Sequence, residues 1–179
     1  MAGRRGRGRP SLRGSRITSG CRAEACRGSR IPSPGLPAYA ERVNLDVRWL
    51  QRFQNLERAV TLLHEPFAGD IARLSALERE GTIQRFEVAV EHGWKTLKDY
   101  LEQQRQTLQP VTPRNVIKEA FKAGILSDGQ VWIDMLDHRN LLAHTYDASQ
   151  VDRAVVAIRD HYLAAFDALR AWLSSEAPA

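Results

Sequence analysis

The sequence predicts an all-α protein, an up-and-down antiparallel helical bundle with four main helices and several short ones. Two observations support this prediction. From residue 43 onward, apolar residues recur every three or four positions, which is the period of a helix that buries one face. No segment shows the sustained alternation of apolar and polar residues, bounded by hairpin turns, that indicates strands. Helices that each bury one face pack together as a bundle.

The first half of the predicted bundle contains two long helices. Apolar residues at helical spacing run through residues 45–63, and Pro66 ends this first helix. A short helical piece follows over residues 70–77. The second long helix carries its apolar stripe over residues 83–101. A short connection between two long helices predicts that they pack as antiparallel neighbours.

Two shorter helices are expected next. Thr112 followed by Pro113 predicts a helix start, because Thr caps a helix and Pro suits its first position. Gly124 is placed to end this helix in a left-handed cap. Residues 127–136 then predict another helix that opens on Ser, Asp and Gly.

The last predicted helix is long. Asp147 and Gln150 have the spacing of a capping box, and the apolar stripe continues over residues 151–173. We therefore place the bundle at residues 43–175, with residues 176–179 as the C-terminal end.

Charge is distributed unevenly along the chain of 179 residues, whose formal net charge is +5. Residues 1–40 hold nine arginines and one acidic residue, a formal charge of +8, so the remaining residues carry −3. The basic character therefore belongs to the N-terminal segment, and the predicted bundle is slightly acidic.

Residues 1–42 are rich in Arg, Gly, Pro and Ser and lack Phe and Trp, so we expect a disordered tail. Three interpretations of this tail stay open: an arginine-rich arm that binds RNA, an organelle transit peptide, or translated DNA upstream of a misassigned start codon. In the third case, Val43 would stand at the true start.

Cysteine usage and apolar runs predict the compartment. Both cysteines, Cys21 and Cys26, lie in the tail, so a disulfide-stapled bundle is not expected. The longest apolar runs have five residues, whereas a membrane span needs about 20. We therefore expect a cytoplasmic protein without a membrane segment. P-loop, H-E-x-x-H and G-x-S-x-G motifs are absent from the sequence, and we predict no metal and no cofactor.

Residues 137–147 gather Asp, His, Arg, Asn and Tyr around a small apolar patch, which is unusual for a helix that only packs. Asn140 and His144 are four residues apart, so a helix would place them on one face. A neutral His144 would take a proton from a ribose 2′-hydroxyl, Arg139 would hold the phosphate, and Asn140 would orient the imidazole. These three are the predicted catalytic residues of a metal-independent ribonuclease. Alternatively, Arg139 pairs with Asp137 or with a neighbouring helix, and His144 is a helix C-terminal histidine.

The stretch from Arg139 to Tyr146, R-N-L-L-A-H-T-Y, is similar to the R-x-x-x-x-H-x-Y motif of HEPN domains. Further segments resemble helices of that family: residues 44–53, 82–87, 94–101 and 113–121. The resemblance covers residues 44–174 and points to the nucleotidyltransferase substrate-binding branch of HEPN proteins.

This resemblance implies a homodimeric HEPN-like bundle that pairs with a minimal nucleotidyltransferase. In related toxin–antitoxin pairs the HEPN protein is a ribonuclease, and the transferase silences it by AMPylation of the motif tyrosine, here Tyr146. Proteins of this branch have also been viewed as non-catalytic subunits that present substrate to the transferase, and this alternative stays open. Glu91, Trp94 and Lys95 are weaker candidates for contacts with the partner or the second copy.

Overall fold

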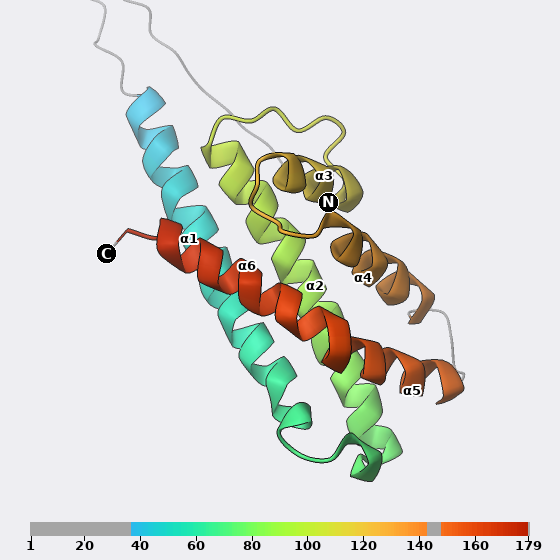
Figure 1. The fold of residues 1–179 in the computed structure, drawn as a ribbon. Coiled ribbons are helices and arrows are strands. Elements are labelled where there is room, and N and C mark those ends of the chain that lie inside the picture. The colour runs from blue at the N-terminus through green and yellow to red at the C-terminus, as the bar shows by residue number, and fades with distance from the viewer. Residues whose placement is uncertain (1–36, 143–147, 179) are drawn as a thin grey trace, which may run out of the picture. The chain divides into compact units, whose positions relative to one another are not determined.

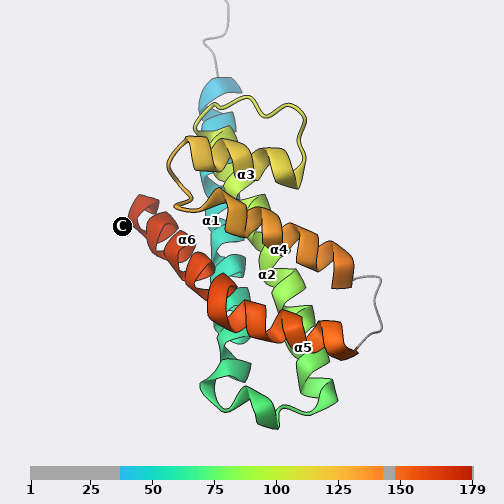
Figure 2. The same cartoon turned by 45° about the vertical axis from the view of Figure 1, so that its right-hand side comes forward.

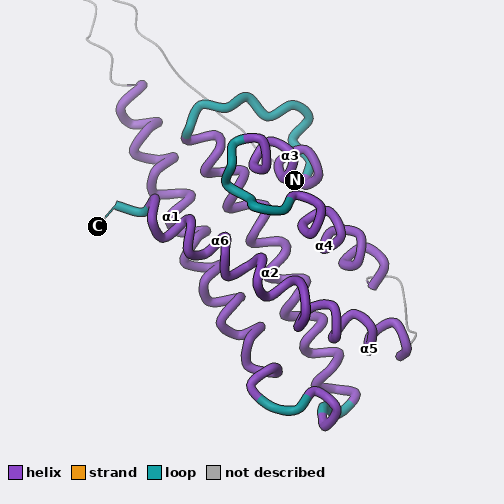
Figure 3. Tube along the Cα trace, in the orientation of Figure 1, coloured by secondary structure: helices purple, strands orange, loops and turns teal. Residues whose placement is uncertain are grey.

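The computed structural model describes residues 37–142 and 148–178, and all of them belong to one compact unit, residues 35–179. These residues form helices, turns and loops, without a strand among them (Figure 3). The all-α class is therefore confirmed. The helical elements are, in order, α1 (Pro37–His64), η1 (Glu65–Ala68), η2 (Ile71–Arg73), α2 (Ala76–Gln103), α3 (Pro113–Lys122), α4 (Gly129–Leu142), α5 (Ala148–Ala157), η3 (Ile158–Tyr162) and α6 (Leu163–Glu176).

The two long helices α1 and α2 run side by side in opposite directions, joined by the short turns η1 and η2 (Figure 1). The elements α5, η3 and α6 form one continuous rod that crosses this pair (Figure 2). Along the rod, α5 packs against α2, and α6 packs against α1. The shorter helices α3 and α4 pack against α2 and against each other. This arrangement leaves α2 in contact with most of the bundle.

The core lies where these helices meet and is built from their apolar stripes. Phe86 on α2, Trp132 on α4 and Phe166 on α6 are among the largest fully buried side chains. The rings of Trp132 and Phe166 meet edge to face, with their centroids 5.2 Å apart. Gly93 lies directly against the Trp132 ring, because a Cβ atom at this position would stand 2.8 Å from Cζ3 of the indole. The close approach of α4 to α2 therefore requires a residue without a side chain.

Both predicted ends of α3 are confirmed. The Thr112 hydroxyl accepts a hydrogen bond from the backbone N–H of Asn115 at 3.3 Å, as a capping residue does. At the other end, Gly124 has a φ of 74°, and the N–H of Ile125 donates to the carbonyl of Ala120 at 3.0 Å. This bond and the positive φ make a left-handed helix cap.

The rod formed by α5, η3 and α6 departs from a regular α-helix at η3, which is a π-helical turn. Ile158, Tyr162 and Phe166 follow one another in two steps of four residues, and at about 100° per residue an α-helix would rotate this stripe by about 80°. The wider π turn absorbs the rotation, so all three side chains are buried. The predicted capping box cannot be compared, because Asp147 lies outside the described residues.

The first helix begins at Pro37, so α1 includes residues 37–42, which the sequence pattern assigned to the tail. Proline is favoured at the first position of a helix, and the Ala, Glu and Arg that follow favour helix formation. The preceding residues, 1–36, lie outside the described part of the chain. Within the described part, no helix is both long and apolar enough to cross a bilayer.

Candidate functional site

Two of the predicted site residues, Arg139 and Asn140, lie in the last turns of α4. Both face a cleft of about 320 Å³ that α2, α3 and α4 form together. The residues that line this cleft are Val90, Glu91, Trp94, Thr112, Pro113, Arg114, Leu136, Arg139 and Asn140. The other two predicted residues, His144 and Tyr146, lie outside the described residues, which end in this region at Leu142. Their position relative to Arg139 therefore stays a prediction.

The motif arginine pairs with a residue from another helix. Nη2 of Arg139 lies 3.6 Å from Oε2 of Glu91 on α2. The sequence offered two partners for Arg139, namely Asp137 or a residue of a neighbouring helix. The partner on the neighbouring helix is observed, whereas Asp137 binds Arg114. The side chains of Arg139 and Glu91 are 40% and 34% exposed, and ion pairs in water contribute only about 0–1 kcal/mol. The guanidinium therefore keeps most of its capacity to bind an anion.

Neighbours on α2 hold Glu91 in place. Lys95 Nζ lies 2.6 Å from Oε1 of Glu91, and Trp94 Nε1 donates to Oε2 at 2.9 Å. Partial burial raises the pKa of the Glu91 carboxyl, but the hydrogen bonds from Lys95 and Trp94 and the charges of Lys95 and Arg139 outweigh it, so the pKa lies below its usual value. Glu91 is thus ionised at neutral pH. The weak candidates Glu91, Trp94 and Lys95 prove to be one cluster beside the motif.

Arg114 was not expected at the site from the sequence. It is the second residue of α3 and lines the cleft beside α4, where it forms an ion pair and hydrogen bond with Asp137. In the sequence, Arg114 directly follows the cap Thr112 and Pro113 and lies within the HEPN-like segment 113–121, but neither signal pointed to a cleft. The cleft thus holds two guanidinium groups, those of Arg114 and Arg139, each beside a carboxylate.

The residue before Arg139 ties α4 to the π-helical turn. The Tyr162 hydroxyl lies 2.6 Å from Nδ1 of His138, and the Tyr162 ring stacks on Phe86 with centroids 5.5 Å apart. Burial, together with the charge of Asp134, raises the pKa of Tyr162 to about 12. The phenol therefore stays protonated, and its bond to His138 fixes the turn of α4 that carries Arg139.

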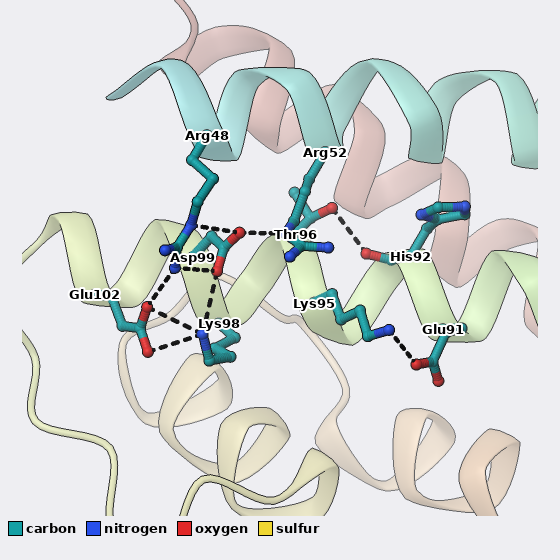
Figure 4. Close-up of polar contacts among 9 residues, drawn as sticks. All are labelled: Arg48, Arg52, Glu91, His92, Lys95, Thr96, Lys98, Asp99 and Glu102. Atoms are coloured by element: carbon teal, nitrogen blue, oxygen red, sulfur yellow. Dashed lines mark hydrogen bonds and ion pairs between the residues drawn. The ribbon is translucent and has the colours of Figure 1, made fainter. Parts of the chain in front are cut away.

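A second polar cluster lies farther along α2, at its contact with α1 (Figure 4). The carboxylate of Asp99 is buried, with 1% of its side chain exposed. Arg48 donates to it at 2.8 and 3.2 Å, Arg52 donates to it as well, and Lys98 lies at 3.2 Å. Glu102 accepts from Arg48 at 2.9 Å and from Lys98 at 3.1 Å. These contacts join α1 to α2, so this cluster has a structural role.

Metal-ligating side chains do not gather at either cluster. Among the described residues, no group of three or more His, Cys, Asp and Glu side chains is arranged to hold a metal ion.

Comparisons with known proteins extend this description. The family model "Nucleotidyltransferase substrate binding protein like" matches residues 51–175. A Haemophilus influenzae protein named "Probable ribonuclease HepT" is 31% identical over 86 residues, which are 46% of this chain and 58% of that relative. The match therefore spans little more than half the length of the relative.

Solved structures are also similar to this chain, among them one from Thermus thermophilus and one from Shewanella oneidensis. The crystal structure of ttk003001694 from Thermus thermophilus superposes with a TM-score of 0.55 at 30% identity, covering 64% of this chain and 94% of the other. A tri-AMPylated HEPN toxin of Shewanella oneidensis, solved in complex with MNT antitoxin, gives a TM-score of 0.48 at 15% identity. That alignment covers 75% of this chain and 96% of the toxin.

Proposed function

This chain belongs to the family of nucleotidyltransferase substrate binding protein-like domains, and we propose that it is the partner subunit of a minimal nucleotidyltransferase and acts as a metal-independent ribonuclease toxin. Family membership confirms the resemblance found in the sequence. The observation that carries the proposal is the placement of Arg139 and Asn140 on one cleft, at the start of the R-x-x-x-x-H-x-Y stretch. The name of the Haemophilus relative supports a ribonuclease activity.

The proposed reaction uses the ribose 2′-hydroxyl as nucleophile. His144 removes the proton of this hydroxyl, the 2′-oxygen forms a bond to the adjacent phosphorus, and the bond from phosphorus to the 5′-oxygen breaks. The proton returns to the 5′-oxygen that leaves. Arg139 stabilises the negative charge that develops on the phosphate oxygens, and Asn140 orients the imidazole. The products are a 2′,3′-cyclic phosphate and a free 5′-hydroxyl.

A test measures cleavage of total RNA by the purified chain in the presence of EDTA. We expect cleavage in EDTA, and Arg139→Ala is expected to lower the rate by about 10²–10³-fold, as loss of one charge-stabilising donor does. Arg159→Ala is the matched control, because Arg159 is similarly exposed, pairs with its neighbour Asp160 and lies outside the cleft. Equal rates for the wild type and Arg139→Ala would refute the assignment of this residue.

AMPylation of Tyr146 is proposed as the silencing step. The added phosphate would bring negative charge beside the motif and compete with RNA for Arg139. Tyr146→Phe keeps the ring but lacks the acceptor hydroxyl, so we expect it to cleave RNA and to resist silencing by the transferase. Mass spectrometry of the Tyr146 peptide after incubation with transferase and ATP measures the modification. A shift of one AMP on a different residue would contradict this site.

We also propose a cytoplasmic homodimer. Phe121 on α3 and Leu141 on α4 are each 51% exposed, and such apolar side chains favour burial against a second copy. Two copies would bring two motifs together, so that their arginines form a locally basic cleft on an otherwise slightly acidic bundle. Light scattering is expected to give twice the monomer mass, and a strict monomer at micromolar concentration would argue against a cleft shared by two motifs.

A second candidate is a non-catalytic subunit that presents substrate to the transferase. The description of the family favours it, and so does the carboxylate of Glu91, which already occupies one side of Arg139. Expression without the transferase separates the two candidates. Growth arrest that Arg139→Ala abolishes supports the toxin. Normal growth and intact RNA, with transferase activity that depends on this chain, would support the substrate-binding subunit instead.

A further inference from the structure

We propose that Arg114 is a second phosphate-binding residue of the cleft, which holds an RNA phosphate next to the one that Arg139 contacts. This inference rests on the proposed ribonuclease function and names a residue outside the motif. It also assigns a role to Asp137, whose carboxylate pairs with the Arg114 guanidinium until an RNA phosphate displaces it.

The position of Arg114 supports this role. Arg114 lines the same cleft as Arg139 but stands on α3, so the two guanidinium groups approach the cleft from different helices. Arg114 also lies in the first turn of α3, where the helix dipole adds partial positive charge to the same wall. An extended phosphate chain that enters the cleft at Arg139 thus meets a second cation, which α3 supplies.

The carboxylate beside Arg114 is easy to displace. The side chains of Arg114 and Asp137 are 53% and 52% exposed, so water solvates both charges when they separate. Such surface pairs contribute about 0–1 kcal/mol, whereas a guanidinium binds phosphate through two parallel hydrogen bonds. Exchange of the carboxylate for a phosphate therefore has little cost.

The arginines at the contact between α1 and α2 behave differently. Arg48 and Arg52 both bind Asp99, whose carboxylate is buried and cannot be released into water without opening the contact between the two helices. Arg48 and Arg52 therefore stabilise the contact between α1 and α2 and are not available to a ligand. The cleft, by contrast, pairs each arginine with an accessible carboxylate, Asp137 or Glu91. The Asp137 carboxylate in particular can turn toward solvent when an anion enters, because half of its side chain is exposed.

Binding of a 2′-O-methyl oligoribonucleotide, which has no 2′-hydroxyl to attack, tests this inference by fluorescence anisotropy. Arg114→Ala is expected to raise the Kd by about tenfold. It should also make the slope of log Kd against log salt shallower by about 0.7, the value for one lost phosphate contact on a single strand. Asp137→Asn is expected to lower the Kd by about threefold, because it frees Arg114. Arg114→Lys keeps the charge and should recover part of the affinity.

Arg114→Ala should raise the Kd and Asp137→Asn should lower it, and these opposite changes distinguish phosphate binding from a purely structural ion pair. If the pair only joined α3 to α4, removal of either partner would change the Kd in the same direction. Arg159→Ala and Asp160→Asn form the matched control, since this pair is also exposed and lies outside the cleft. We expect neither of them to change the Kd.

The outcomes separate this inference from the proposed function. An unchanged Kd and salt slope in Arg114→Ala, while Arg139→Ala still lowers the cleavage rate, would overturn the role of Arg114 alone. Failure of the wild type to cleave any RNA would overturn the ribonuclease, and the anisotropy would still report whether Arg114 binds the phosphate chain. A change of the Kd in the same direction for Arg114→Ala and Asp137→Asn would also reject the inference.

Discussion

Asp99 offers the strongest test of how polar groups hold the two long helices together. The substitution Asp99→Asn keeps the shape of the side chain and removes the charge that Arg48, Arg52 and Lys98 share. Loss of one partner of a buried ion pair costs about 3–5 kcal/mol when the remaining charge stays buried. Here the side chains of Arg48 and Arg52 are 44% and 37% exposed, so water can solvate them after the substitution. We therefore expect a smaller loss of about 2–3 kcal/mol in the free energy of unfolding.

The dependence on pH gives this prediction a second, independent readout. Burial raises the pKa of Asp99, but the hydrogen bonds from Arg48 and Arg52 and the charge of Arg52 outweigh it, so the pKa lies below its usual value. A carboxyl whose pKa is lowered by folding stabilises the fold above the unfolded pKa of about 3.9. This stabilisation is lost as the pH falls through the folded pKa. The difference between the wild type and Asp99→Asn should therefore be largest at neutral pH and shrink in acid.

Urea unfolding, followed by circular dichroism at pH 7 and at pH 3, measures the loss of free energy of unfolding and its change with pH. Thermal unfolding of the same variants gives the midpoint temperature. At pH 7 the midpoint temperature should also fall by about 5–10 °C for a bundle of this size. Asp160→Asn is the control, because its pair with Arg159 is exposed and its loss should change the free energy of unfolding far less. The reasoning fails if Asp99→Asn lowers the free energy of unfolding no more than this control does. It also fails if Asp99→Asn lowers this free energy by the same amount at both pH values.

Three further substitutions test the packing and the backbone of the bundle by thermal and urea unfolding. Gly93→Ala places a Cβ atom 2.8 Å from the Trp132 ring and should cost about 1–3 kcal/mol; a neutral result would mean that α4 can move away from α2. Arg105→Gly should stabilise the bundle by about 0.5–1 kcal/mol, because Arg105 has a φ of 61°, which favours glycine. A loss of stability in this variant would contradict the left-handed conformation at the end of α2. Tyr162→Phe keeps the ring but removes the hydrogen bond to His138, and a cost of about 1 kcal/mol is expected. An unchanged midpoint would show that this bond does not anchor α4.

The pattern of apolar residues was sufficient to predict the helical class, and Thr112, Pro113 and Gly124 predicted the ends of α3. These features are local, because a helix start at Thr112 or a left-handed cap at Gly124 depends on the backbone preferences of a few consecutive residues. The sequence singled out Arg139 and Asn140, because the motif departs from the pattern of a helix that only packs, but it gave no sign of the cleft that both line. The π-helical turn at Ile158–Tyr162 was not predicted, because the same spacing of apolar residues also suits an α-helix. Only packing against the neighbouring helices shows that the stripe must not rotate about the helix axis.

The sequence by itself determined which helices form and which stretch carries the chemical groups, because periodicity and caps act between residues close in the chain. Only the tertiary structure decided which groups meet across helices. Arg139 faces Glu91 and Arg114 faces Asp137 because α3 and α4 pack on one side of α2. An ion pair between helices depends on which faces pack together and on how deeply each charge is buried. No spacing along the chain encodes that geometry, since each of these two arginines pairs with a carboxylate that is distant in sequence.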